Sequence, residues 1–399
     1  MSPLEKATRE HTKSHNRRLI LRTIYDQGEI SRVDISRQTQ LTRTTVSGNV
    51  SELIDEGLVR EVGIVEAVVG KPPTLLSVVE DARHLLGLDL SGGHLRGAVV
   101  NLRGKVRYEA SIALSGQSGQ AALEQVYALL EQLMASTDKP LLGIGIGTSG
   151  LVDTPSGVIR QAVNLDWHQL PIRDLLSQRY RLPVYVANDS HVAAIAEHTF
   201  GRHKNLPNLL VVKVGWGIGM GLMLNGRLFY GDEGGAGEIG HVVVAEHGPI
   251  CRCGNFGCME TVASSQAILQ QARMLTIHHP GSRLSQLAKG ELTMEDVMTA
   301  WREGEPLLQP LIANAGRYLG VGLAHVVGAL NIRHVLIAGS VAEFGPTLLE
   351  PLAAQVRQRT LATLAAQVQI EASTLGPSIV SLGAAALLLA HELGLNQFP

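Results

Sequence analysis

Residues 209–219 read Leu-Leu-Val-Val-Lys-Val-Gly-Trp-Gly-Ile-Gly, an apolar run that passes directly into a glycine-rich turn. Three further apolar runs, at residues 85–90, 141–146 and 334–337, also end in glycine-bearing turns. A buried strand that ends in such a turn lets backbone N–H groups approach a phosphate or a sugar. One turn of this kind is weak evidence, because glycine also serves ordinary tight turns. Four of them indicate two α/β halves around a cleft.

The segments between these runs have helical patterns, at residues 121–134, 171–180, 192–200 and 310–330. Apolar strands that alternate with helices are typical of α/β folds. The chain has 399 residues, of which 45% are hydrophobic, so it can bury a large core. We therefore expect a two-lobed body with the layout of the actin/hexokinase-like ATPase fold.

Charge is distributed unevenly along the chain. The first 50 residues hold nine Lys/Arg and five Asp/Glu and carry a net charge of +4, whereas the whole chain carries −2. This balance excludes a protein that coats nucleic acid with its entire surface. An aromatic content of 4% argues against a nucleic-acid surface built on base stacking. A basic head on an acidic body predicts a polyanionic partner for the head alone.

The basic head has the pattern of three short helices followed by two strands. A helical apolar stripe covers residues 17–26, and Ser31 opens a second helix through a capping-box pattern. Thr42 is a good N-cap for a third helix, and residues 58–62 and 74–79 follow as two strands. Three short helices followed by a β-hairpin are typical of a winged helix-turn-helix domain.

The third helix of such a domain enters the major groove with its N-terminal polar residues toward base edges, and its free N–H groups suit a phosphate contact. A lysine in the wing would reach a neighbouring phosphate or the minor groove. The predicted DNA-binding residues are Arg32, Thr42, Arg43, Thr44, Thr45, Ser47, Asn49 and Lys71. A small helical interaction module with a solvated polar face is the alternative for this segment.

All three cysteines lie within eight residues and follow a histidine in the pattern H-x9-C-x-C-x4-C. Three thiolates and an imidazole fill the tetrahedral positions of Zn²⁺ and leave none for a catalytic water, so the pattern predicts a structural zinc site. The predicted ligands are His241, Cys251, Cys253 and Cys258. The alternatives are a chance cluster and a redox site. An odd cysteine number without an export signal argues against disulfides and favours a reducing cytoplasm.

Residues 234–241 read GGAGEIGH and lead into CRCGNFGCMET at residues 251–261. This segment strongly resembles the signature of the ROK family, which contains repressors, uncharacterised open reading frames and sugar kinases. Residues 70–78 (GKPPTLLSV) resemble the wing and linker of ROK repressors such as the N-acetylglucosamine and xylose repressors. The resemblance implies a winged helix-turn-helix domain with linker at residues 1–80 and a two-lobed sugar-binding domain at residues 81–399.

The resemblance also implies a set of sugar contacts. Carboxylates and amides suit a sugar, because they accept from and donate to pairs of hydroxyls. A zinc-bound histidine has a second nitrogen free to meet a sugar hydroxyl. The implied contacts are Asn164, Asn188, Asp189, Glu238, His241 and Glu260. Arg160 and Arg173 are candidates for a sugar phosphate by sequence position only. Without the resemblance, Asn164 is a turn residue and Glu238 a solvated loop carboxylate.

Asp189 also matches the general base of the ROK kinases, but the nucleotide loops depart from the kinase pattern. The kinases carry D-x-G-G-T-K at the first phosphate loop, where residues 89–94 here read DLSGGH. Trp216 replaces the threonine of a G-T-G-I-G loop, and residues 338–340 read Ala-Gly-Ser where the family often has three glycines. Loss of the threonine hydroxyl and of the lysine cation weakens phosphate binding by this loop. We therefore expect no enzyme activity and a vestigial role for Asp189.

Together these features predict a sequence-specific transcriptional regulator of sugar-metabolism genes, of the repressor type, controlled by a sugar or sugar derivative. The expected partners are double-stranded operator DNA, the sugar, and further copies of the chain in a homodimer or homotetramer. We expect a cytoplasmic protein without a membrane span. One alternative is an ATP-dependent sugar kinase with an appended DNA-binding domain. The other is a repressor controlled by a transport-system protein.

Overall fold

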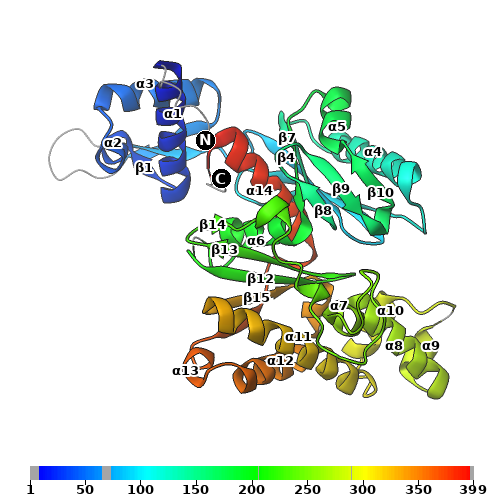
Figure 1. Cartoon of the computed structure of the whole chain (residues 1–399). Helices are drawn as coiled ribbons and strands as arrows, with labels where there is room; N and C mark the ends of the chain where they lie inside the picture. Colours follow the sequence, from blue (N-terminus) through cyan, green and yellow to red (C-terminus); the bar gives the residue numbers. More distant parts are fainter. Residues whose placement is uncertain (1–8, 65–72, 205, 289, 396–399) are drawn as a thin grey trace.

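The computed structural model describes residues 9–64, 73–204, 206–288 and 290–395, which form a small N-terminal head and a body of two α/β lobes (Figure 1). The head has three helices and a three-stranded antiparallel sheet with strand order β1-β3-β2. Its elements are α1 (Arg9–Gln27), β1 (Ile30–Ser31), α2 (Arg32–Thr39), α3 (Arg43–Asp55), β2 (Val59–Ile64) and β3 (Thr74–Val78). The predicted winged helix-turn-helix is therefore present.

Local hydrogen bonds fix the helix starts of the head as predicted. The Ser31 hydroxyl accepts a hydrogen bond from the backbone N–H of Asp34 and so caps α2. The Thr42 hydroxyl accepts from the N–H of Thr45 at 3.2 Å and caps α3. Helix α2 ends at Thr39, and Gln40 then turns the chain with a left-handed φ of 57°. These caps satisfy backbone N–H groups in the first turns of α2 and α3 and so fix where the two helices begin.

The first lobe is built on a five-stranded sheet with order β11-β7-β4-β5-β6. Its strands are β4 (His84–Leu90), β5 (His94–Asn101), β6 (Val106–Ala113), β7 (Leu141–Thr148) and β11 (Val184–Asn188). Helices α4 (Gly119–Ala135) and α5 (Ile172–Tyr180) pack on its outer side together with a small sheet. The small sheet contains β8 (Leu151–Asp153), β9 (Val158–Ala162) and β10 (Trp167–Leu170), and the 3-10 turn η1 (Val163–Leu165) joins its last two strands.

The second lobe has another five-stranded sheet, with order β14-β13-β12-β15-β16. Its strands are β12 (Leu209–Val214), β13 (Ile218–Leu224), β14 (Arg227–Leu228), β15 (His334–Ala338) and β16 (Gln369–Ala372). The outer helices are α7 (Met259–Ala263), α8 (Ser265–His278), α9 (Arg283–Leu287), α10 (Met294–Arg302), α11 (Leu308–Leu330), α12 (Pro346–Arg359) and α13 (Ala362–Ala365). Single 3-10 turns complete the lobe: η2 (Asp232–Gly234), η3 (Ile239–His241), η4 (Ser340–Phe344) and η5 (Gly376–Ser378).

Two helices lie between the sheets. Helix α6 (Asp189–Phe200) packs on β12 and β13 of the second lobe, and α14 (Ile379–Leu393) packs on β4 and β7 of the first (Figure 1). The two helices also pack on each other. The stretch 376–393 is long and apolar enough to cross a membrane, but 67% of it is buried inside the protein. It is therefore a core helix, which agrees with the sequence.

The predicted strand-to-glycine turns and helices are confirmed. The four turns follow β4, β7, β12 and β15, and the four helical patterns correspond to α4, α5, α6 and α11. Helix α6 begins three residues before the predicted start, because the Asn188 side chain caps it at Asp189. This earlier start carries two predicted site residues to the end of a helix between the lobes.

We predict that Gly145→Ala destabilises the body by about 1–3 kcal/mol or more, because the added methyl has no space. A Cβ at Gly145 would lie 1.9 Å from the carbonyl oxygen of Ala384 in α14. Gly328→Ala is the matched control. It lies in α11 with nothing within 4 Å of its Cβ position, and it should stabilise by up to about 1 kcal/mol. Urea denaturation measures both, and equal stability of the two variants would contradict this packing.

Candidate functional site

A cavity of about 430 Å³ lies between the two lobes, beside the first turn of α6. Residues of the first lobe line one wall, including Gly150 and Asn188, and residues of the second lobe line the other, including Gly217. All six side chains implied as sugar contacts line this one cavity: Asn164, Asn188, Asp189, Glu238, His241 and Glu260. The fold thus brings together residues that are almost a hundred positions apart in the sequence.

Asn188 and Asp189 occupy the junction of β11 and α6. The Asn188 Oδ1 accepts hydrogen bonds from the N–H groups of Ser190 and His191, and its Nδ2 donates to the Gly150 carbonyl at 3.0 Å. The Asn188 amide therefore holds the helix start and the neighbouring glycine turn in position. The Asp189 side chain is buried, with 7% of the residue exposed, and its Oδ1 accepts from the Ser190 N–H at 2.8 Å.

Lys213 supplies the counter-ion of Asp189. Its Nζ donates to the Asp189 Oδ2 at 2.7 Å and to the Ser91 hydroxyl at 3.1 Å. Burial by itself would lower the pKa of Lys213, but the Asp189 and Asp89 carboxylates outweigh burial and raise it. The ammonium is therefore charged at neutral pH.

A second pair of residues spans the cavity mouth. Asn164 lies in η1 of the first lobe, and its Oδ1 accepts a hydrogen bond from Nη1 of Arg252 at 3.0 Å. Arg252 belongs to the cysteine-rich loop of the second lobe, between Cys251 and Cys253. The bond joins the lobes across the site, so Asn164 is more than an isolated turn residue.

Three further polar side chains line the second-lobe wall. The His241 Nε2 lies 3.8 Å from the Glu238 Oε2, and the His241 Nδ1 lies 3.6 Å from the Glu260 Oε1. Loss of hydration in the cavity raises the pKa of Glu238, and the His241 side chain opposes this effect. The wall therefore presents two carboxylates and one imidazole to the cavity.

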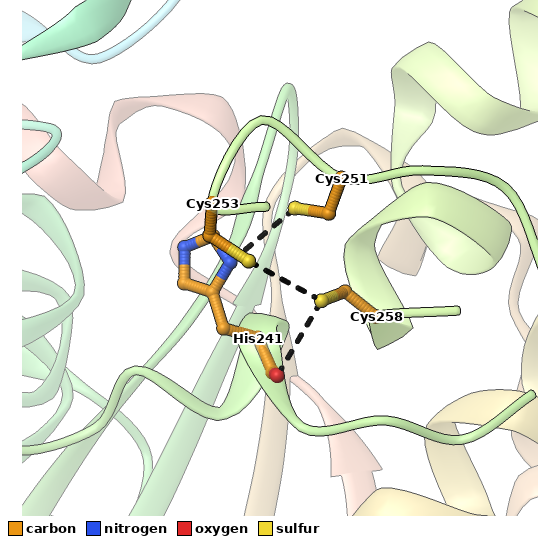
Figure 2. A group of neighbouring side chains, drawn as sticks. All are labelled: His241, Cys251, Cys253 and Cys258. Carbon is orange, nitrogen blue, oxygen red and sulfur yellow. Dashed lines mark hydrogen bonds between the residues drawn. The ribbon is translucent and has the colours of Figure 1, made fainter. Parts of the chain in front are cut away.

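His241, Cys251, Cys253 and Cys258 form a compact donor group, with ligand atoms all within 4.8 Å of one another (Figure 2). The Cys253 and Cys258 sulfurs are 3.6 Å apart, and the Cys251 sulfur is 3.5 Å from the His241 Nδ1. The loop closes this tightly only with glycine at position 257, where a Cβ would lie 1.6 Å from the Ala245 carbonyl oxygen. This group could hold a metal ion through sulfur and nitrogen atoms.

Lys213 and Arg252 are site residues that the sequence reasoning missed. Lys213 gives one signal in the sequence, because it is the sole charged residue in the buried run of residues 209–214. A buried lysine requires a counter-ion, so this position could have been marked. Arg252 gives no such signal in the sequence, because arginine is common in polar loops. The phosphate candidates Arg160 and Arg173 are engaged elsewhere, Arg160 with Asp153 and Glu233, and Arg173 with three backbone carbonyls.

The DNA-binding candidates fall into three groups. Thr42, Arg43, Thr44 and Ser47 are exposed at or near the start of α3, and Thr45 is half-buried there. Arg32 is bound to Glu61 of the wing strand β2 at 2.9 Å. Lys71 lies outside the described residues.

The sequence wrongly assigns Asn49 to a polar face of α3. The structure buries it, with 7% of the residue exposed, and its Nδ2 donates to the Thr45 carbonyl at 2.9 Å. The physical reason is helical periodicity, because Asn49 lies three residues after Val46 and four before Leu53 on the inward face.

The known proteins that resemble this chain agree with the architecture. The sequence model of the ROK family matches residues 85–391, which is most of the chain. The chain belongs to the ROK family. A second model, for winged helix-turn-helix DNA-binding domains, matches residues 13–60 of the head.

Relatives of this ROK protein include repressors that match over nearly their full length. The xylose repressor of Caldicellulosiruptor bescii is 32% identical over 97% of this chain and 98% of its own. A solved ROK family transcriptional regulator, a homologue of the E. coli MLC protein, covers 96% of this chain and 98% of its own, with 30% identity and a TM-score of 0.81. A DNA-binding, sugar-responsive repressor is therefore supported.

The ROK family also contains kinases that match the body alone. The Streptomyces griseus ROK glucokinase, solved with glucose and AMPPNP, covers 76% of this chain and 98% of its own, with 27% identity and a TM-score of 0.71. The head is thus the part that this ROK protein shares with the regulators and not with that kinase. The repressor matches favour a protein that is not an enzyme.

We predict that Cys258→Ser lowers the metal content of the purified protein from about one ion per chain to near zero, because a hydroxyl replaces a thiolate ligand. His247→Ala is the control, since this nearby histidine lies outside the donor group. Inductively coupled plasma mass spectrometry measures the bound metal. The donor group is misassigned if the serine variant keeps as much metal as the control.

Proposed function

We propose that the effector of this repressor is a neutral sugar, which binds in the cavity between the lobes and changes the affinity of the head for operator DNA. One observation carries the proposal: six sugar-type side chains converge on one cavity in a chain that also has a winged helix-turn-helix head. A sugar presents a ring of hydroxyls, and the cavity wall offers carboxylates, amides and an imidazole to accept and donate.

The charges in the cavity favour a neutral sugar over a sugar phosphate. Its carboxylates are Asp189, Glu238 and Glu260, and its cations are Lys213 and Arg252. Lys213 is already bound to Asp189, and Arg252 is bound to Asn164. A phosphate group would meet two carboxylates without an unengaged cation among the described lining residues, which is unfavourable.

The metal in the donor group is proposed to be a structural Zn²⁺. Three sulfurs and one nitrogen match the ligand preference of zinc, and four protein ligands leave no open position for chemistry. His241 would ligate through Nδ1, which faces the Cys251 sulfur, and its Nε2 would remain on the Glu238 side of the cavity. The metal would thereby hold His241, Arg252 and Glu260 in their places around the sugar.

The altered nucleotide loops support a body that binds sugar without transferring phosphate. Gly92, Gly93, His94, Trp216 and Ser340 all line a second cavity of about 540 Å³ next to the first. By the resemblance to the ROK kinases, this cavity would be the nucleotide side, where Gly93 and His94 stand in place of the threonine and lysine of the kinase phosphate loop. An active kinase with an appended head is the rival, and it predicts ADP release with the same sugars.

A continuous set of contacts leads from the sugar cavity to the head. Asp189 begins α6, and Phe200 ends it with its ring against Gly104, where a Cβ would lie 2.6 Å from the ring. Gly104 belongs to the β5–β6 turn. Next to it, the Arg103 guanidinium donates to the Tyr25 carbonyl at 2.6 Å and stacks 4.1 Å from the Tyr25 ring centroid.

Tyr25 lies in α1 of the head and also donates its hydroxyl to the Leu102 carbonyl at 2.8 Å. Burial raises the pKa of Tyr25 to about 12, so the hydroxyl keeps its proton throughout the physiological range. A small displacement of α6 by a bound sugar would therefore reach the head through the turn at residues 101–105. Coupling of this kind requires that the protein have two conformations and that the sugar bind them with different affinities.

The proposed assembly is a homodimer or homotetramer that presents paired heads to a pseudo-palindromic operator in the cytoplasm. Pairing of heads matches the two-fold symmetry of such operators. A protein of a sugar transport system remains the alternative effector, and the described surface carries no feature that identifies it.

The first test measures the affinity of the protein for fluorescent DNA from its own upstream region. Four compounds are added in separate titrations: D-xylose, D-glucose, N-acetyl-D-glucosamine and glucose 6-phosphate. We predict that one neutral sugar changes the operator affinity by at least about fivefold and that the phosphate has no effect. Glu238→Gln should weaken the sugar response by about tenfold or more without loss of DNA binding. Glu233→Gln is the matched control, because Glu233 is exposed and bound to Arg160.

Each of three other results would indicate a different conclusion. Operator binding that no sugar changes, but that a transport-system protein abolishes, would replace the sugar by a protein effector. Sugar-dependent ADP release in a coupled assay would establish the kinase rival. If the protein binds DNA from its upstream region no more tightly than random DNA, that region does not contain its operator.

A second prediction concerns the contact between head and body. Arg103→Ala should keep the operator affinity without sugar and the sugar affinity within about threefold, but reduce the sugar-induced change in operator affinity. The reason is that it removes the guanidinium between the turn and Tyr25. Arg179→Ala is the control, since Arg179 pairs with Glu131 on an exposed face of the first lobe. A full sugar response in Arg103→Ala would exclude this route.

A further inference from the structure

Lys213 lies at the junction of the two cavities. Lys213 and Ser91 line both the sugar cavity and the second cavity. Lys213 comes from β12 of the second lobe, and Ser91 follows β4 of the first lobe. The ammonium and the hydroxyl, 3.1 Å apart, therefore form a partition between the cavities and a contact between the lobes.

The partition is held by a chain of polar bonds. The Ser91 hydroxyl donates to the Asp89 carboxylate, and the Lys213 ammonium donates to the Ser91 hydroxyl and to the Asp189 carboxylate. Lys213 is buried, with 8% of the residue exposed, so its charge is balanced by these groups and not by water. One Asp189 oxygen is thus fixed by the ammonium and the other by the Ser190 N–H.

We propose that Lys213 is a positioning residue of the sugar site, which holds the Asp189 carboxylate as a hydrogen-bond acceptor for a sugar hydroxyl and closes the sugar cavity toward the second cavity. The inference rests on the proposed function, because it assigns a role within the same site. It gives a residue-level reason why this body binds a sugar without transferring phosphate.

The closing role follows from the geometry of the junction. A phosphoryl group that passed from the second cavity to a sugar hydroxyl would have to cross the place that Lys213 and Ser91 fill. In-line displacement requires the attacking oxygen and the phosphorus to meet there. A carboxylate that acts as general base must also have an oxygen free to take up the hydroxyl proton, but the Asp189 Oδ2 already accepts a hydrogen bond from the Lys213 ammonium at 2.7 Å.

The positioning role follows from the surrounding charges. Asp89 on β4, Arg96 on β5, and His191 and Glu238 beside Asp189 are the titratable or charged groups that face the pair. Without the ammonium, the buried Asp189 carboxylate loses both its direct counter-ion and the bond that fixes its Oδ2. A neutral residue at position 213 should therefore make sugar binding more sensitive to acid.

The test measures sugar affinity by calorimetry for wild type, Lys213→Gln, Lys213→Arg and the exposed control Lys139→Gln, with D-xylose, D-glucose and N-acetyl-D-glucosamine. Lys213→Gln keeps a hydrogen-bond donor of similar length, and operator binding verifies that it folds. We expect it to weaken binding of the cognate sugar by about tenfold or more at pH 7.5. Lys139→Gln should bind as wild type does.

The pH profile separates positioning from a merely structural role. The ratio of the dissociation constants of Lys213→Gln and wild type should rise as the pH falls from 8 to 6, because the variant lacks the positive charge that faces the buried carboxylates. Lys213→Arg retains the charge, so its ratio should stay constant with pH even if its larger side chain lowers affinity.

The outcomes distinguish this inference from the function on which it rests. If wild type binds one of the three sugars and Lys213→Gln binds it equally at every pH, Lys213 does not position Asp189 and the inference is overturned alone. A constant ratio with weakened binding also overturns it, since a structural defect would give that result. If wild type binds none of the sugars, the proposed function fails and the inference falls with it.

Discussion

The backbone of α14 lies directly against β7 on one side and against α6 on the other, and the rest of the body depends on this close contact. A Cβ at Gly145 would meet the Ala384 carbonyl oxygen at 1.9 Å, and a Cβ at Gly383 would meet the Val192 carbonyl oxygen at 1.8 Å. Because no side chain separates these backbones, β7, α14 and α6 are packed as one close unit. The two helices thereby fix the spacing of the two sheets and the position of the cleft.

The same packing sets both ends of the functional arrangement. The first turn of α6 carries Asp189 to the wall of the sugar cavity, and its last turn carries Phe200 to the turn that contacts the head. The end of α14 also reaches the head, where Arg18 of α1 packs on Gly394. The hydrophobic core is continuous from α1 and α3 through the first sheet to α6 and α14. The head is therefore packed on the body and not merely tethered to it.

The cysteine-rich loop at residues 241–258 contributes to the cavity through residues next to its donor group. Arg252 lies between two cysteines of the donor group, and Glu260 follows two residues after Cys258. Both line the sugar cavity together with His241. A loop of this composition has few apolar contacts of its own, and a bound metal would replace the missing core. In the proposed function, sugar binding and loop folding are thus properties of the same short segment.

The sequence by itself determined the features that local rules control. The caps at Ser31 and Thr42, the glycine turns after buried strands and the spacing of the three cysteines depend on residues a few positions apart, so their patterns can be read directly. The resemblance to the ROK family also identified the six cavity residues. Only the tertiary structure decided which partners the charged side chains find. Lys213 pairs with residues 24 and 122 positions away and Arg252 with one 88 positions away, so no local pattern specifies either contact.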